Sequence, residues 1–362
     1  MKPIELIVGT YTYTDSLGIY RLRFDPDSMS IDGSGIVTGI QNPSFLTVHP
    51  NGSYVFAVSE ISKGLVYSYQ IGKSDGAALL GVEETGGAGP CHIELNRDGT
   101  VAVVSNYEDG SVASFLVGDD GNLQKASSVI QHSGSSVDPA RQDKPHAHSA
   151  TYSHEGDRVF IADLGIDKIV SYGLKMPDGV IEPDRKRVKS AGTGFGPRHF
   201  CWHPSGRYLY CINELDSSIS TFMNTADGFL THLQTVSTIP SELSRQNTCA
   251  DIHISPDGKY VYGSNRGHDS IAIFAVDSLS RKITFKVAIP SGGNTPRNFA
   301  LTPDGRFIFV ANQNSNNIVI FERDSTTGLI NLTGVEIQIP LPVCIKFLPD
   351  PDITYSNRVL HT

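Results

Sequence analysis

The stretch GFGPRHFCWHPSGRYLYCINELDSSISTF, residues 194–222, decides the fold. Its first part, from Arg198 to His203, runs into a Pro-Ser-Gly turn. Its second part, from Tyr208, is a short apolar run that ends in a polar pair, Asn213 and Glu214. Two short runs joined by a Pro/Gly turn predict two antiparallel strands.

The same pattern occurs six times along the chain. Each copy has a turn glycine, and successive turn glycines are 47 to 57 residues apart: Gly52, Gly99, Gly156, Gly206, Gly258 and Gly305. This spacing is about the length of one four-stranded propeller blade. Apolar residues at helical spacing are hard to find elsewhere, so the sequence predicts an all-β protein.

The two ends of the chain supply a seventh unit. The segment 342–349 resembles a first strand, and segments 4–11, 18–25 and 31–40 resemble strands two to four. We therefore expect a single domain, residues 1–362, folded as a seven-bladed β-propeller with four-stranded antiparallel blades. N-terminal strands pairing with a C-terminal strand would close the ring. An open solenoid or two separate sandwiches would leave sheet edges exposed.

Composition excludes several classes of partner. The net charge of −9 argues against nucleic-acid binding, which needs a basic face. The five cysteines are odd in number and lack CxxC spacing, so we expect reduced, buried thiols. We see no signal peptide and no run long enough to span a membrane. The sequence thus predicts a cytoplasmic protein, either a monomer or a weak homo-oligomer.

The register of the repeat places polar residues at one mouth of the central channel. The beginning of an innermost strand lies beside the end of the antiparallel second strand, so residues at fixed offsets from the turn glycines should gather there. Eight and seven residues before the glycines, the ionisable or polar positions include His92, His148, Arg198, His199, Asp251 and Arg297. Eight and seven residues after them come Glu60, Glu214, Asn265 and Arg266.

These positions have two explanations. Burying polar groups on strands costs free energy unless water or a ligand forms hydrogen bonds with them, which favours a ligand site. The Asn and Asp residues seven after the glycine, Asn265 among them, could instead cap the following turn. Arg198, Arg266 and Arg297 suit a carboxylate or phosphate, so a small anionic substrate is expected. Alternatively these arginines form a structural ion-pair network with acidic neighbours.

Two long connections, 131–148 and 237–250, lead to the same mouth and could form a lid or have no role. The first carries Arg141 and His146, and the second carries Arg245.

The sequence has no GxSxG elbow, phosphate-binding glycine loop or HExxH motif. Three arginines argue against a metal at the mouth, so we expect neither a metal nor another cofactor. A non-catalytic propeller that binds a protein partner remains an alternative.

Several motifs resemble those of a known family. They are GTYT (9–12), GPCH (89–92), PHAHS (145–149), GPRHF (196–200), INEL (212–215) and TPRNF (295–299). Together they make the chain similar to the seven-bladed lactonase propellers, which include cycloisomerase-type 6-phosphogluconolactonases and fungal 3-carboxy-cis,cis-muconate lactonizing enzymes. The resemblance covers essentially the whole chain.

The resemblance implies a lactone site. It places catalytic residues at His148, Arg198, Glu214 and Arg266, and it favours His148 over the neighbouring His146. We expect Glu214 or His148 to act as general base while arginines hold the substrate and the developing charge. The expected substrate-binding residues are His92, His146, His199, Asp251, Asn265, Arg297 and Glu60. The favoured reaction is hydrolysis of 6-phosphogluconolactone; muconate cyclisation is the alternative.

Overall fold

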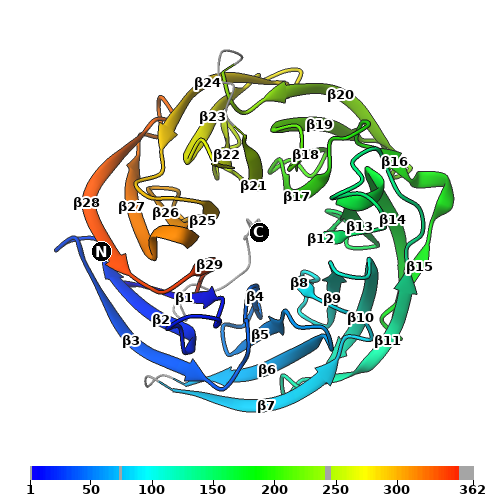
Figure 1. The fold of residues 1–362 in the computed structure, drawn as a ribbon, viewed down its shortest axis with the longest axis horizontal. Coiled ribbons are helices and arrows are strands. Elements are labelled where there is room, and N and C mark those ends of the chain that lie inside the picture. The colour runs from blue at the N-terminus through cyan, green and yellow to red at the C-terminus, as the bar shows by residue number, and fades with distance from the viewer. Residues whose placement is uncertain (1, 73–75, 241–245, 350–362) are drawn as a thin grey trace.

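A computed structural model describes residues 2–72, 76–240 and 246–349. In these residues the strands form seven sheets arranged radially around a central axis, as Figure 1 shows. The predicted seven-bladed, all-β propeller is therefore confirmed. Residues 350–362 of the predicted domain lie outside the described part.

Each blade runs from an innermost strand beside the channel to an outermost strand at the rim. In that order, the first blade contains β29 (Pro342–Phe347), β1 (Ile4–Thr10), β2 (Gly18–Asp25) and β3 (Ser30–Thr38). The second contains β4 (Leu46–Val48), β5 (Tyr54–Ser59), β6 (Leu65–Ile71) and β7 (Ala77–Glu84). The third contains β8 (Pro90–Leu95), β9 (Val101–Asn106), β10 (Ser111–Val117) and β11 (Leu123–Gln131). The fourth is β12 (Ala147–Tyr152), β13 (Arg158–Asp163), β14 (Lys168–Lys175), β15 (Val180–Pro183), with β16 (Lys189–Ser190) also pairing with β14.

The remaining blades follow the same order. They are β17 (Pro197–Trp202), β18 (Tyr208–Asn213), β19 (Ser218–Asn224), β20 (Leu230–Ser237); β21 (Thr248–Ile254), β22 (Tyr260–Arg266), β23 (Ser270–Val276), β24 (Ile283–Pro290); and β25 (Pro296–Leu301), β26 (Phe307–Asn312), β27 (Asn317–Arg323), β28 (Ile330–Gln338). Three short 3₁₀ turns, η1 (Leu164–Ile166), η2 (Arg185–Arg187) and η3 (Gln313–Ser315), complete the described elements. None of the described helical segments could cross a membrane.

The ring is closed by the two ends of the described chain. Strand β29 pairs antiparallel with β1, with Gly9 opposite Cys344. Each innermost strand also contacts the innermost strands of both neighbouring blades all the way round. Closure pairs or covers the sheet edges that an open array would expose.

The six turn glycines adopt a left-handed backbone. Their φ angles lie between 69° and 76°. A Cβ atom at Gly206 would come within 2.4 Å of the His154 ring, and one at Gly99 within 2.2 Å of His49. All six turns therefore favour glycine for its conformation, and at turns such as those of Gly99 and Gly206 a side chain would also clash.

The hydrophobic core lies between blades. Tyr210 and Ile212 of one blade pack with Val261 and Phe274 of the next. Each large apolar side chain buried in this way contributes about 1.5–3 kcal/mol. Because the blade flanks carry this packing, the strand ends that face the axis are left for polar residues.

A β-bulge at the start of the innermost strand presents the predicted polar column to the channel. In β17, Pro197 and His199 pair with consecutive residues of β18, so Arg198 is the extra residue. The same irregularity occurs at His148 in β12 and at Arg297 in β25. Such bulges bend the strand and redirect a side chain. The same repeated β-bulge therefore directs the side chains of three candidate site residues.

Candidate functional site

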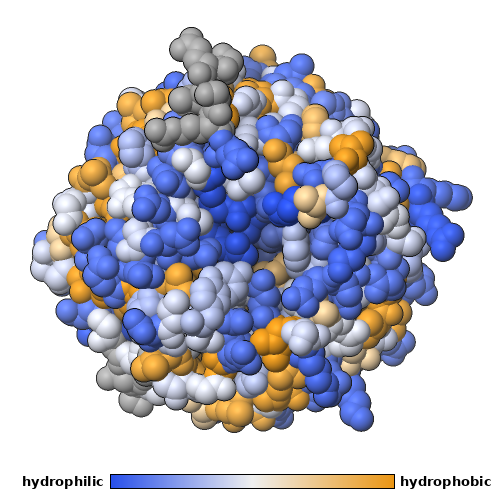
Figure 2. Space-filling model, viewed as in Figure 1, coloured by the Kyte–Doolittle hydropathy of each residue, from blue (hydrophilic) through white to orange (hydrophobic). Residues whose placement is uncertain are grey.

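The face of the ring seen in Figure 2 is hollowed and hydrophilic at its centre. Glu214 comes just after β18, and three arginines contact it. Arg198 Nε donates to Glu214 Oε2 at 2.8 Å, and Arg266 Nη2 lies 2.9 Å from the same oxygen. Arg141 Nη2 donates to Oε1 at 2.5 Å. Arg198 and Arg266 therefore both pair with Glu214, one of the contacts that the ion-pair alternative predicted.

Burial makes this cluster strongly coupled. The side chains of Arg198 and Glu214 are 2% and 5% exposed. Burial alone would raise the pKa of Glu214, but Arg266, Arg198 and Arg141 outweigh it and hold that pKa well below its ordinary value. Burial and the nearby Arg266 lower the pKa of Arg198 to about 10, so its guanidinium stays charged at neutral pH. Glu214 is thus a fixed anion and a weak proton acceptor.

A second carboxylate, Glu60, lies across the mouth. The Tyr11 hydroxyl lies 3.0 Å from Glu60 Oε2 and donates to it, and Arg297 Nη2 donates to the same hydroxyl at 2.8 Å. The Arg297 guanidinium also lies over the Tyr11 ring, 5.3 Å from its centroid. Glu60 and Arg297 are therefore connected through a tyrosine.

Arg198 and Arg297 line one small cavity of about 10 Å³ together with Ser44, Cys91 and His199. The Ser44 hydroxyl is buried there with no hydrogen-bond partner in the described chain. A buried polar atom without a partner is costly. The cavity has room for about one water molecule, which the Ser44 hydroxyl could bind.

Three histidines pack ring against ring in the channel beside this cavity. The His199 centroid lies 5.3 Å from that of His148 and 5.4 Å from that of His92. Burial lowers the pKa of all three, for His199 to about 4, and Arg198 adds to the lowering at His148. All three imidazoles are therefore neutral at pH 7.

Asp251 lies on the other side of His199. Its Oδ1 accepts from His199 Nδ1 at 2.8 Å, and its Oδ2 accepts from Asn298 Nδ2 at 2.6 Å and from His253 Nε2 at 3.0 Å. Burial would raise the pKa of Asp251, but the contacts with His253 and His199 hold it well below its ordinary value. A cavity of about 30 Å³ beside Asp251, room for about two water molecules, also contacts Lys346.

Two predicted site residues are placed elsewhere. Asn265 is fully buried, and its side chain bonds Ser270 of its own blade and Thr238 in the connection from the preceding blade. This matches the turn-capping alternative. His146 precedes the bulge, bonds the carbonyl of Tyr107 at 2.7 Å and stacks on the Tyr107 ring. It flanks the site, whereas His148 faces the channel arginines.

Sequence reasoning left three contact residues out of the site. Tyr11, Tyr107 and Arg141 come from different blades or connections, and none has a strong chemical signature alone. Tyr107 occupies the Glu214 position of its own repeat, and its hydroxyl accepts from Arg141 at 3.1 Å. Repeat position was therefore the available signal for Tyr107. Tyr11 lies within the GTYT segment.

The connection 131–148 is anchored over the site. Gln142 is fully buried and donates to Leu164 O and Asp167 Oδ1, both at 2.8 Å. This anchor fixes the segment from which Arg141 reaches Glu214. In the connection 237–250, residues 241–245, including Arg245, lie outside the described part.

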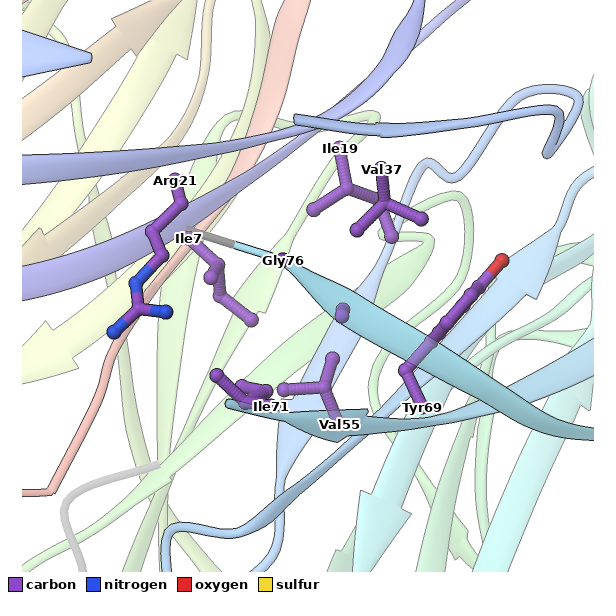
Figure 3. Close-up of a pocket in the computed structure, with 9 residues that line it drawn as sticks. Ile7, Ile19, Arg21, Val37, Val55, Tyr69, Ile71 and Gly76 are labelled. Carbon is purple, nitrogen blue, oxygen red and sulfur yellow. The ribbon is translucent and has the colours of Figure 1, made fainter. Parts of the chain in front are cut away.

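Another pocket lies away from the channel, between the blades of β1 and β5 (Figure 3). Its lining is mostly aliphatic, including Ile7, Ile19 and Val55. Arg21 at its edge is paired with Glu5 at 2.7 Å. Among the described residues, no group of three or more His, Cys, Asp or Glu side chains is arranged to hold a metal ion.

Known proteins match this chain over nearly its whole length. The 6-phosphogluconolactonase of Bacillus subtilis is 35% identical over 344 residues, covering 94% of this chain and 97% of the relative. A crystal structure titled a putative 6-phosphogluconolactonase from Bacteroides fragilis has a TM-score of 0.90 and 34% identity, and the match covers 96% of this chain and 98% of that one. The Pseudomonas aeruginosa periplasmic gluconolactonase has a TM-score of 0.91 and 32% identity, covering 96% and 99%.

A family model agrees with these matches. The model described as "Lactonase, 7-bladed beta-propeller" matches residues 5–347, which include all of the channel residues of the site and every strand of the ring except the first residue of β1. Its match therefore spans both the closing blade and the bulged strands. The chain belongs to the 7-bladed β-propeller lactonase family.

Proposed function

We propose that this lactonase hydrolyses a phosphorylated sugar lactone, 6-phosphogluconolactone, to 6-phosphogluconate. The observation that carries the proposal is a charge imbalance at the mouth. Four guanidinium groups, those of Arg141, Arg198, Arg266 and Arg297, face two carboxylates, Glu60 and Glu214. The channel histidines are neutral, and Asp251 and Lys346, which line the cavity on the other side of His199, have opposite charges, so none of these groups changes the balance.

The excess of two positive charges suits a phosphate monoester. Such a group carries about −1.5 to −2 charges at pH 7. Guanidinium groups bind phosphate through two parallel hydrogen bonds. An acidic protein, with a net charge of −9, that keeps four arginines at one mouth has the electrostatics for an anionic ligand.

The neighbouring groups support ester hydrolysis. Water must add to the lactone carbonyl, and the oxyanion that forms needs hydrogen-bond donors. Arg198 lies beside both the free cavity and the neutral imidazoles, so it is the donor best placed for the oxyanion. Because three arginines hold Glu214 ionised, its role in this proposal is to orient them, and an imidazole takes the proton.

The test is hydrolysis of freshly prepared 6-phosphogluconolactone, corrected for spontaneous opening, beside unphosphorylated gluconolactone under the same conditions. We expect kcat/KM to be at least about 100-fold higher for the phosphorylated substrate, since charged hydrogen bonds are worth about 1.5–3 kcal/mol each. Equal kcat/KM values for the two lactones would show that the enzyme does not recognise the phosphate, and that part of the proposal would be wrong. Absence of hydrolysis with either would overturn it.

A muconate-type lactonizing activity would need the same arginines for substrate carboxylates. The names of the relatives favour hydrolysis, because the Bacillus subtilis and Pseudomonas aeruginosa proteins are named for lactones of gluconate. Absorbance assays with carboxymuconate and its lactone separate the two reactions directly.

The proposal includes a cytoplasmic location and a monomer or weak homo-oligomer. We also propose that the protein binds neither nucleic acid nor a membrane. The five cysteines are all unpaired and buried, which fits a reducing compartment. One structural neighbour is titled periplasmic, so cell fractionation is the direct test of location. Light scattering at micromolar and millimolar concentrations tests the oligomeric state.

A further inference from the structure

Two channel histidines with similar burial have different partners. His148 and His199 are 4% and 6% exposed, and their rings are in contact. His199 Nδ1 is bonded to the carboxylate of Asp251. The nearest side-chain partner of His148 Nδ1 is the thiol of Cys91, 3.9 Å away. Only one of the two imidazoles is therefore paired with an anion.

This difference decides which imidazole can accept a proton. A general base becomes an imidazolium in the transition state, and an adjacent carboxylate stabilises that cation and fixes the ring. At His148 the nearby charges are Arg198 and Arg297, which oppose protonation. At His199 burial, Arg198 and Lys346 also oppose protonation, but Asp251 favours it.

We propose that His199, oriented by Asp251, is the general base that activates water, and that His148 stays neutral and donates a hydrogen bond to the lactone carbonyl. This inference rests on the proposed lactone hydrolysis. His199 is suited to the first role because its ring borders both the cavity of Arg198 and Arg297 and the cavity beside Asp251. Its Nδ1 is occupied, so Nε2 is the nitrogen left to face water.

Proton transfer in this step is balanced within the site. Nε2 of His199 takes one proton from water while the water oxygen bonds to the carbonyl carbon. The ring C–O bond then breaks, and the imidazolium returns its proton to the departing alkoxide. The product is the open hydroxy acid, whose carboxyl proton passes to solvent. Asp251 keeps its negative charge throughout.

The carboxylate of Asp251 provides a matched control. It accepts comparable hydrogen bonds from His199 and His253, but His253 does not line the cavity of Arg198 and Arg297. His253→Gln therefore removes one imidazole from Asp251 without touching the reacting groups. Because His253 shares the Asp251 carboxylate with His199, we expect kcat of His253→Gln to fall, but by much less than that of His199→Gln, and we expect the acid limb to remain.

The experiment measures kcat, KM and the pH dependence of kcat for wild type, His199→Gln, Asp251→Asn, His148→Gln and His253→Gln. His199→Gln should lower kcat by about 10²–10⁴-fold with little change in KM. Wild-type kcat should fall as the pH drops towards about 4, where His199 becomes protonated. This acid limb should remain in His148→Gln, although kcat is lower there.

The outcomes separate the two proposals. If wild type hydrolyses the lactone but His199→Gln retains kcat within about 3-fold, or if His148→Gln abolishes the acid limb, the assignment of the base is wrong and the lactonase function stands. If wild type hydrolyses no lactone, the proposed function fails and the base assignment fails with it.

Asp251 is buried and accepts five hydrogen bonds, so thermal melting of Asp251→Asn must be measured alongside its kinetics. Nitrogen NMR of His199 gives a further readout, since the proposal requires hydrogen on Nδ1.

Discussion

Two buried carboxylates in the channel are stabilised as anions by different partners. Glu214 contacts three guanidinium groups, which stay charged at all working pH values. Asp251 contacts two imidazoles and an amide, and the imidazole of His199 can gain or lose a proton. The comparison indicates that the Glu214 cluster holds charge in place while the Asp251 cluster can support proton transfer. Substitutions in the Glu214 cluster should therefore change substrate binding, charge stabilisation and folding rather than the acid limb of kcat.

The largest effect is expected from Arg198→Ala. The substitution leaves Glu214 with two arginines, removes the donor beside the imidazoles and opens a space at a site that is 2% exposed. We expect kcat/KM to fall by about 10³-fold and stability to fall by about 3–5 kcal/mol. Steady-state kinetics and denaturant unfolding measure these two losses separately.

Arg306→Ala is the control for Arg198→Ala, since Arg306 also pairs with a glutamate but its side chain is 41% exposed. It should change stability by at most about 1 kcal/mol. An active Arg198→Ala protein would contradict the placement of Arg198 beside the reacting carbonyl.

Glu214→Gln should show a pH-dependent loss of stability. The folded-state pKa of Glu214 is held below its ordinary value, so the charged form stabilises the fold above about pH 4.3, and the contribution is lost as pH falls below that. The melting temperature of the variant should therefore lie below that of wild type by a constant amount from pH 5 to 8. Towards pH 3 this difference in melting temperature should become smaller.

The control for Glu214→Gln is Glu322→Gln, because Glu322 belongs to an exposed ion pair. Its melting temperature should stay close to that of wild type throughout the range. A gap for Glu214→Gln that does not depend on pH would mean that the charge of Glu214 is not what the arginines stabilise.

Arg141→Ala should affect binding more than folding. Arg141 reaches Glu214 from the connection 131–148, and its side chain is 36% exposed. We expect KM to rise about 10-fold while the melting temperature changes little. Arg185→Ala, an exposed arginine on η2, is the control. A fall in kcat with unchanged KM would assign Arg141 to the chemical step.

The sequence allowed the fold and the location of the site to be predicted because both follow from a repeat. The turn glycines set the register, and the register predicted that Arg198, Glu214 and Arg266 would meet at one mouth. The ion-pair alternative left open which carboxylate the arginines would contact, since three guanidinium groups around one carboxylate depend on side-chain directions in several blades and a connection. The bulge that turns Arg198 inward has no signature in a single copy of the repeat.

Asp251 shows the same limit. Its repeat position predicted that it faces the channel, and the structure agrees. However, its partner His253 lies two residues along the same strand, and Asn298 comes from the next blade. A one-dimensional offset cannot show which of these polar neighbours a carboxylate contacts. The difference between the Glu214 and Asp251 clusters therefore emerges only in three dimensions.

The smallest effect is expected from Tyr11→Phe, which tests whether the mouth works as one charged unit. The hydroxyl connects Arg297 to Glu60, and without it the two groups lose their common partner. The loss of one such hydrogen bond costs about 1 kcal/mol, so kcat/KM should fall about 5-fold, mostly through KM. Tyr13→Phe is the matched control, because Tyr13 is 63% exposed beside Tyr11 and should tolerate the change. If Tyr11→Phe instead costs as much as Arg198→Ala, the tyrosine itself contacts the reacting atoms, and the mouth rather than the histidine-lined channel holds the lactone carbonyl.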